Sequence, residues 1–186
     1  MIFLSWNCRG LASKPKKLAL KEMVQRFNLV VLMLQETLGM SEEVSSSLNS
    51  LLPGWNFQAM DSLGHSGGLA MGIRVGRLKL INLWGVGHAL GMEVLSSYLG
   101  IPLMIVNIYG PCQGRVSFWN ALLSKSVMRN QNLVVGRDLN FSIGNAETWG
   151  PSAREYSLSD FFMNPLNSHN LMDVNLLKLR PTWRNR

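Results

Sequence analysis

The chain has 186 residues, of which 47% are apolar, so it is long enough to form one domain with a substantial core. Eighteen Lys and Arg outnumber eleven Asp and Glu and give a formal net charge of +7, which favours an anionic partner such as nucleic acid. Apolar runs such as Leu29–Leu34 fall far short of the roughly 20 residues that a membrane-spanning helix needs. The N-terminus carries no signal-peptide pattern, so we expect an intracellular, monomeric protein that does not bind membranes.

The first half of the chain alternates strand-like and helix-like segments. An apolar strand is predicted over Ile2–Trp6, and Pro15 suits the first turn of a helix over Pro15–Phe27. A second strand over Leu29–Gln35 precedes a helix that begins at Ser41 and ends near Leu52, before Pro53-Gly54.

The second half contains more strands, several of them separated by glycine-containing turns. Further helices are expected over Ser117–Met128 and Ser157–Asn167. Consecutive strands with intervening helices predict an α/β fold in which helices cover packed sheets. The expected strands are Trp55–Met60, Leu69–Arg74, Leu78–Trp84, Met92–Ser96, Leu103–Tyr109, Leu133–Gly136 and Leu171–Val174.

Polar side chains stand where four of the apolar strands end. Asn7 follows the first strand and Glu36 the second, Tyr109 ends the Leu103–Tyr109 strand, and Asp138 and Asn140 follow Leu133–Gly136. Loops at one edge of a sheet can direct such groups into one pocket. Neither the two cysteines, Cys8 and Cys112, nor the three histidines form a comparable pattern, and we expect the thiols to be reduced packing residues.

Six short motifs occur in one order along the whole chain, and together they resemble the endonuclease/exonuclease/phosphatase superfamily. Their wording is closest to plant LINE-type (non-LTR) retrotransposon endonucleases. The motifs are Trp6-Asn7-Cys8-Arg9-Gly10, Leu34-Gln35-Glu36-Thr37, Ser66-Gly67-Gly68, Asn107-Ile108-Tyr109-Gly110-Pro111, Gly136-Arg137-Asp138-Leu139-Asn140-Phe141 and Pro181-Thr182-Trp183-Arg184-Asn185.

The resemblance implies a four-layer α/β sandwich over residues 1–186 and a set of residue roles for phosphodiester hydrolysis. Glu36, with Asn7, would hold Mg²⁺ or Mn²⁺, because hard oxygen ligands suit these cations. Asp138 would position or deprotonate the attacking water, Asn140 would orient the phosphate, and Tyr109 would hydrogen-bond a phosphate oxygen. Candidate DNA-contacting residues are Arg9, Ser66, Thr182 and Trp183.

Each of these residues also has a purely structural interpretation. Glu36 and Asp138 could be solvated carboxylates at strand ends, Tyr109 an aromatic anchor for a loop, and Asn7 a turn former. Ser66-Gly67-Gly68 is expected to be a tight turn that brings backbone near the site. Thr182-Trp183 could equally belong to a strand, and the lysines of the first helix could form a solvated helix face.

Two features depart from the superfamily pattern. A Ser-Asp-His segment, which the resemblance would place after the Thr182-Trp183 motif, does not occur in the sequence, which ends at Arg186. The expected sandwich would therefore be incomplete at its C-terminal end, and hydrolysis would be impaired. Arg137 stands where Gly usually precedes the catalytic Asp, and it could block the site or pair with Asp138.

The sequence therefore predicts a Mg²⁺-dependent DNA endonuclease of a LINE-type retroelement, which would act on nuclear DNA and precede a reverse transcriptase domain. Two alternatives remain open. One is a catalytically inactive relic that at most binds nucleic acid, and the other is an abasic-site nuclease or a phosphatase of the same superfamily.

Overall fold

Strands form at almost every apolar run that the sequence suggested, and they assemble into two sheets. The computed structural model describes residues 1–63, 66–140, 161 and 168–174. Within these residues the first sheet has four strands in the order β1-β2-β4-β3, and the second has four strands in the order β5-β6-β7-β8. The first sheet contains β1 (Phe3–Asn7), β2 (Val31–Gln35), β3 (Trp55–Leu63) and β4 (Ser66–Arg74); the second contains β5 (Leu78–Val86), β6 (Ala89–Ser96), β7 (Pro102–Tyr109) and β8 (Leu133–Asp138).

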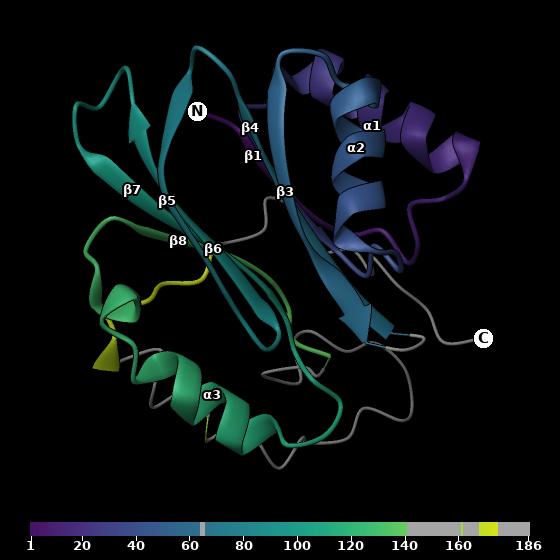
Figure 1. The fold of residues 1–186 in the computed structure, drawn as a ribbon. Coiled ribbons are helices and arrows are strands. Elements are labelled where there is room, and N and C mark those ends of the chain that lie inside the picture. Colours follow the sequence, from purple (N-terminus) through teal and green to yellow (C-terminus); the bar gives the residue numbers. More distant parts are fainter. Residues whose placement is uncertain (64–65, 141–160, 162–167, 175–186) are drawn as a thin grey trace, which may run out of the picture. The chain divides into compact units, whose positions relative to one another are not determined.

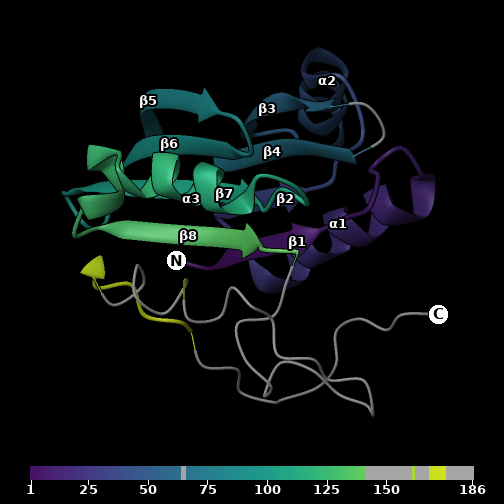
Figure 2. The ribbon, with the colours of Figure 1, turned by 90° about the horizontal axis from the view of Figure 1, so that it is seen from below.

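Each sheet contains one parallel pair of strands, and the C-terminal ends of that pair lie at the same edge of the sheet. In the first sheet β1 and β2 are parallel, with Asn7 opposite Gln35. In the second sheet β7 and β8 are parallel, with Tyr109 opposite Asp138. The remaining neighbours are antiparallel. Figure 2 shows β1 and β8 running side by side where the two sheets face one another.

Two helices cover the outer face of the first sheet (Figure 1). They are α1 (Lys14–Phe27) and α2 (Ser41–Leu51). Leu20 of α1 and Leu48 of α2 are fully buried against Leu32, Leu34 and their neighbours in one hydrophobic cluster. Burial of one leucine side chain stabilises the fold by about 1.5–3 kcal/mol, so this layer is held by its apolar faces.

A second hydrophobic cluster fills the space between the sheets. Alternate residues of each strand point into it, among them Met33 of β2, Met71 of β4, Met92 of β6 and Ile105 of β7. The helix α3 (Arg115–Leu123) lies on the far side of the second sheet (Figure 1). The predicted four-layer α/β sandwich is therefore confirmed, with helices outside two packed sheets.

Three sequence predictions need correction. The helix expected over Ser117–Met128 is two elements, α3 and the 3-10 helix η1 (Ser126–Arg129), because Lys125 between them has an extended backbone conformation, with ψ of 138°. Ser66 opens β4 instead of forming a tight turn with Gly67 and Gly68.

Leu171–Val174 is not a strand. The Val174 amide is bonded to the Asp173 side chain, and Met172 and Val174 are 92% and 86% exposed, so their side chains have no packing surface. The rest of the expected Ser157–Asn167 helix, apart from Phe161, lies outside the described residues. In the described part of the chain, no helix is long and apolar enough to cross a membrane.

The chain divides into two compact units, Met1–Leu139 and Asn140–Arg186. Both sheets and all the labelled helices belong to the first unit. The described residues of the second unit are Asn140, Phe161 and 168–174.

Candidate active site

Two hydrogen bonds join strand ends of the first sheet to strand ends of the second. The Asn7 amide nitrogen donates to Oδ2 of Asp138 over 2.5 Å, and the Tyr109 hydroxyl donates to Oε1 of Glu36 over 2.5 Å. Since Tyr109 and Asp138 are paired on β7 and β8, and Asn7 is paired with the residue before Glu36, the four side chains form one cluster. Four of the predicted catalytic residues are therefore gathered at one edge of the sandwich.

A buried amide network beneath this cluster fixes the spacing of the sheets. Asn107, on the inner face of β7, donates from its side chain to the carbonyl oxygens of Leu34 (3.0 Å) and Ala70 (3.1 Å) in the opposite sheet. Its own oxygen accepts from the Gln35 side chain over 2.5 Å. Both amides are almost completely buried, and a buried amide without partners would cost free energy. This pair was not predicted from the sequence, although Gln35 belongs to the Leu34-Gln35-Glu36-Thr37 motif and Asn107 to the Asn107-Ile108-Tyr109-Gly110-Pro111 motif.

The Glu36 carboxylate reaches the second sheet because its backbone leaves the extended conformation. Gln35 faces the second sheet, so continued alternation would turn Glu36 toward the helices. Instead Glu36 has φ of +53°, a left-handed conformation that costs a non-glycine residue about 1–3 kcal/mol. The neighbouring backbone supports this conformation, since the Gly10 amide donates to the Glu36 carbonyl over 2.6 Å and the Thr37 amide donates to the Gly68 carbonyl over 3.2 Å.

The glycines of the Ser66-Gly67-Gly68 motif allow that support. Gly68 has φ of +79°, and a Cβ added there would overlap the Thr37 hydroxyl oxygen and lie 3.2 Å from the Leu38 amide nitrogen. The motif therefore brings backbone against the Glu36 loop, as expected, although it does so as the start of a strand.

Both ends of the Asn7 amide are engaged within the protein. Its oxygen accepts the Arg9 amide hydrogen over 3.0 Å while its nitrogen donates to Asp138. This arrangement orients the Asp138 carboxylate. It also makes Glu36 the better candidate of the two predicted metal-binding residues, because among the described residues only Tyr109 hydrogen-bonds to its carboxylate.

The other predicted site residues have different outcomes. Arg9 is exposed and has φ of +45° in the loop after β1. Ser66 is placed by its backbone at the start of β4. Asn140 has φ of +57° and belongs to the second unit, so its role stays a prediction. Thr182 and Trp183 lie outside the described residues.

The two cysteines differ in their surroundings. Cys8 is buried, and its thiol donates to the Gln35 carbonyl over 3.1 Å. Burial raises the pKa of the Cys8 thiol to about 11, so it is a packing residue as expected. Cys112 is exposed, so its predicted packing role is wrong.

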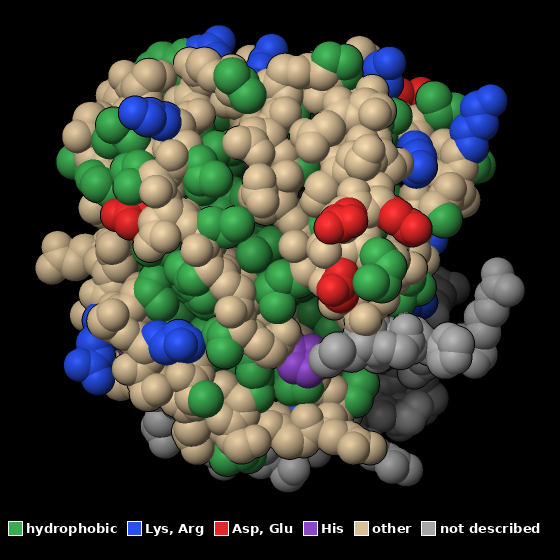
Figure 3. Space-filling view, viewed as in Figure 1, with side chains coloured by type: hydrophobic (Ala, Val, Ile, Leu, Met, Phe, Trp, Pro, Cys, Tyr) green, Lys and Arg blue, Asp and Glu red, His purple; other side chains and the backbone are tan. Residues whose placement is uncertain are grey.

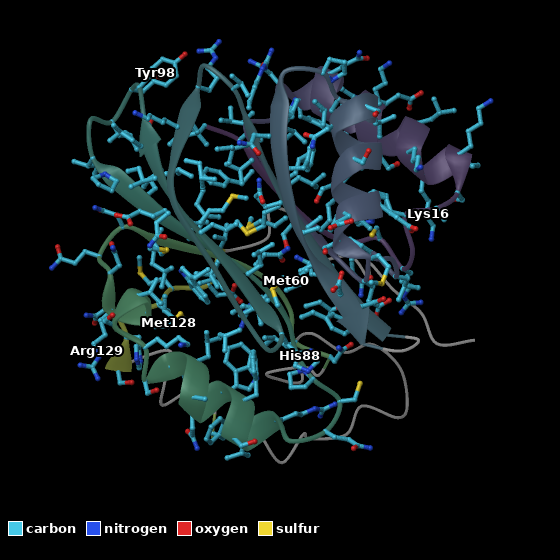
Figure 4. The ribbon with its side chains drawn as sticks, viewed as in Figure 1. Lys16, Met60, His88, Tyr98, Met128 and Arg129 are labelled. Atoms are coloured by element: carbon cyan, nitrogen blue, oxygen red, sulfur yellow. The ribbon has the colours of Figure 1, made fainter. Side chains whose placement is uncertain are left out.

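A small hollow of about 270 Å³, part of it open to solvent, lies next to Tyr109. Its walls include Met60, Gly68 and His88. Figure 4 labels Met60 and His88. His88 stands in the turn between β5 and β6, where partial burial lowers the pKa of its imidazole and favours the neutral ring. Sequence patterns did not single out this residue.

The described residues contain no group of three or more His, Cys, Asp and Glu side chains placed to hold a metal ion. A single carboxylate still fits Mg²⁺, which usually binds one or two carboxylates and keeps several waters. On the face drawn in Figure 3, Lys and Arg side chains lie scattered around the margin, so that face does not concentrate the net charge of +7.

Solved structures with the same fold include several nucleases. The endonuclease domain of TRAS1, a telomere-specific non-LTR retrotransposon, has a TM-score of 0.62 at 13% identity, over 90% of this chain and 69% of that one. The AP endonuclease LMAP from Leishmania major has a TM-score of 0.64 at 16% identity, over 90% and 66%. The human Nocturnin catalytic domain has a TM-score of 0.58 at 16% identity, over 75% and 64%. The chain thus spans about two thirds of the length of these proteins.

No curated protein matches the chain in sequence. The sequence profile of the endonuclease/exonuclease/phosphatase family, however, matches residues 4–185, which is nearly the whole chain. The match covers all four clustered side chains and every labelled helix and strand except Phe3, the first residue of β1. This chain therefore belongs to the endonuclease/exonuclease/phosphatase family.

Proposed function

We propose that the chain is a Mg²⁺-dependent DNA endonuclease of a plant LINE-type retroelement. The observation that carries this proposal is the pair of hydrogen bonds between the sheets, Asn7 to Asp138 and Tyr109 to Glu36. Solvated strand-end carboxylates would have no need of partners on the opposite sheet. A prearranged cluster of two carboxylates, an amide and a phenol instead suits hydrolysis of a phosphodiester, in which negative charge increases at phosphorus.

Glu36 is the residue that would hold the cation, Mg²⁺ or Mn²⁺. Tyr109 fixes Oε1 of the carboxylate, which presents the other oxygen in a defined direction. A bound divalent cation would supply neutralisation of phosphate charge and a lower pKa for bound water. Tyr109 is proposed to orient Glu36 through its single hydroxyl hydrogen. The hydrogen bond to a phosphate oxygen that the resemblance implies would require this hydrogen to turn from Glu36 to the phosphate.

Asp138 would orient the attacking water and accept its proton. The amide of Asn7 binds one oxygen of this carboxylate, so the side chain cannot rotate freely when substrate arrives. Orientation of this kind contributes to rate because the reacting groups need not be ordered during the reaction. Asn140, two residues beyond Asp138, is proposed to bind the phosphate, and Arg9, Ser66, Thr182 and Trp183 to contact the flanking DNA.

DNA is the preferred substrate class because of the net positive charge and the residues of the sequence motifs. A charge of +7 favours a polyanion over a small phosphorylated molecule. The fold shared with a retrotransposon endonuclease domain supports the same choice, while the fold shared with an AP endonuclease supports the abasic-site alternative. A reverse transcriptase domain in the same polyprotein and action in the nucleus follow from the retroelement proposal.

The test is a nicking assay on supercoiled plasmid in Mg²⁺. It compares the parent with Glu36→Gln and with Glu42→Gln, a matched change at an exposed glutamate of α2. It is run on residues 1–186 and on a longer chain that adds a family Ser-Asp-His segment. Nicking that requires Mg²⁺, is lost in Glu36→Gln and survives in Glu42→Gln supports the proposal.

Two substrates distinguish the alternatives. A duplex with a single abasic site and a small phosphomonoester are assayed beside intact plasmid. Cleavage restricted to the abasic duplex, or release of phosphate from the monoester alone, would replace the proposed substrate. Salt-sensitive DNA binding with no cleavage by either chain would favour the inactive relic.

A further inference from the structure

Lys16, in the first turn of α1, reaches back to the loop that follows β1 (Figure 4). Its ammonium nitrogen lies 2.6 Å from the Arg9 carbonyl oxygen and 3.0 Å from the Gly10 carbonyl oxygen. Both loop residues have left-handed backbone conformations, with φ of +45° and +86°. A charged donor shared by two consecutive carbonyls is a strong contact, and here it holds a loop conformation that is unfavourable for Arg9.

The two residues that Lys16 holds each donate one backbone hydrogen bond to a residue of the candidate site. The Arg9 amide donates to the side-chain oxygen of Asn7 over 3.0 Å. The Gly10 amide donates to the backbone carbonyl of Glu36 over 2.6 Å. Lys16 is therefore linked through Arg9 to the side-chain amide of Asn7, which orients Asp138. It is linked through Gly10 to the backbone of Glu36, the proposed metal ligand.

We propose that Lys16 is a positioning residue, which sets the orientation of the Asn7 amide and the backbone of Glu36 through the carbonyls of Arg9 and Gly10. The ammonium touches neither of the site side chains itself. Without it, Arg9 can relax to an extended conformation, which turns its amide hydrogen away from Asn7 and frees the side-chain amide to rotate. The assignment rests on the proposed function, since positioning has meaning only for a working site.

The neighbouring lysines show that this contact is not a general property of the helix. Lys17 donates to the Ser47 hydroxyl over 2.7 Å and so joins α1 to α2. Lys14 and Lys21 are exposed. The expectation that the lysines of this helix form a solvated face therefore does not hold for Lys16. Its positive charge also acts on the buried Cys8 thiol, whose pKa it lowers against the larger effect of burial.

The experiment is amide hydrogen exchange with NMR of the Asn7 side-chain amide, recorded on the 186-residue chain without metal or DNA. Lys16→Met keeps the aliphatic stem and removes all donors, Lys16→Arg restores charge and donors, and Lys17→Met is the control. In Lys16→Met we expect exchange of the Arg9 amide to accelerate about tenfold relative to the core amides of β2, with a shift of the Asn7 amide signals. Lys16→Arg should return both readouts toward the parent, and Lys17→Met should change neither.

Unchanged Arg9 exchange and unchanged Asn7 signals in Lys16→Met would overturn the assignment. An equal effect in Lys17→Met would do the same, because it would indicate general loosening of α1. If Lys16→Met does not fold, Lys16→Gln, which has one uncharged donor group, is judged by the same two readouts. Because no substrate is present, these results are independent of the nicking assay, so failure of the positioning role and failure of the proposed function are told apart.

Discussion

Replacement of Gly110 by alanine is predicted to displace Asp138 from the candidate site. A Cβ added at Gly110 would overlap the Leu139 carbonyl oxygen and lie 2.7 Å from its carbonyl carbon and 3.0 Å from its Cα. Ordinary contacts of this kind begin at 3.4 Å, so the Leu139 peptide must move by at least 0.7 Å, the difference between 3.4 and 2.7. The obstacle is backbone, which cannot rotate aside as a side chain can, and this backbone follows directly on Asp138.

The expected cost combines overpacking with a lost hydrogen bond. Overpacking of this kind destabilises by about 1–3 kcal/mol. The shift also strains the bond from the Gly110 amide to the Asp138 carbonyl, now 2.6 Å, and the 2.5 Å contact between Asn7 and Asp138. Each kcal/mol lowers Tm by about 2–4 °C in a domain of this size. Cleavage should fall by more than the loss of folded protein explains, by about 10²-fold, because the displaced carboxylate would no longer be aligned.

Thermal unfolding and nicking rates at a temperature where both proteins are folded measure the two effects. Gly54→Ala is the control, because Gly54 lies in a turn where, apart from its chain neighbours, no atom is within 4 Å of an added Cβ. Because Gly54 has φ of +84°, alanine there lowers the free energy of unfolding only by the cost of a left-handed backbone, about 1–2 kcal/mol. If Gly110→Ala unfolded at the parent's temperature and cleaved at the parent's rate, the reasoning from the Leu139 contact would be refuted.

Three further predictions concern single side chains. Tyr109→Phe removes the hydrogen bond to the Glu36 carboxylate and should lower the nicking rate about 10²–10³-fold and weaken Mn²⁺ binding, measured by electron paramagnetic resonance, while the ring keeps its packing. Arg137→Gly should leave the nicking rate within about threefold of the parent, because successive residues of β8 point to opposite faces of the sheet and Asp138 is on the face that meets Asn7; a large gain would show that the arginine blocks the site. Iodoacetamide at pH 8 should alkylate the exposed Cys112 rapidly and spare Cys8, whose pKa is about 11; modification of Cys8 by mass spectrometry at an equal rate would contradict its burial.

Much of the sandwich could be predicted from apolar runs because the central strands of the two sheets, β2, β4, β6 and β7, are buried on at least one face. All five residues of β2, for example, are buried, and they lie within the strand predicted over Leu29–Gln35. Leu171–Val174 has the same kind of composition, yet a strand requires a partner for its backbone hydrogen bonds, and composition does not show whether one is present. Its exposed Met172 and Val174 demonstrate that an apolar segment alone does not define a strand.

The residues of the candidate site were predictable as strand-end polar groups, but their pairing was not. Asn7 and Asp138 are separated by 131 residues, and Tyr109 and Glu36 by 73. Only the stacking of the two sheets determines which strand end faces which. The left-handed backbone of Glu36 was equally hidden, since it depends on the loops around Gly10 and Gly68 and not on the glutamate itself.

Arg137 illustrates how a strand boundary decides the interpretation of a neighbouring residue. The predicted strand stopped at Gly136, which would leave Arg137 in a loop that could turn toward Asp138. The structure extends β8 to Asp138, so successive side chains point to opposite faces of the sheet. Gly136 faces the first sheet, because a Cβ added there would lie 2.7 Å from the terminal methyl of Met33. Asp138 shares that face and meets Asn7, and Arg137 is directed to the other side of the sheet. A cation next to the proposed catalytic carboxylate in sequence is therefore separated from it by the sheet, and this favours an arginine that the site can tolerate.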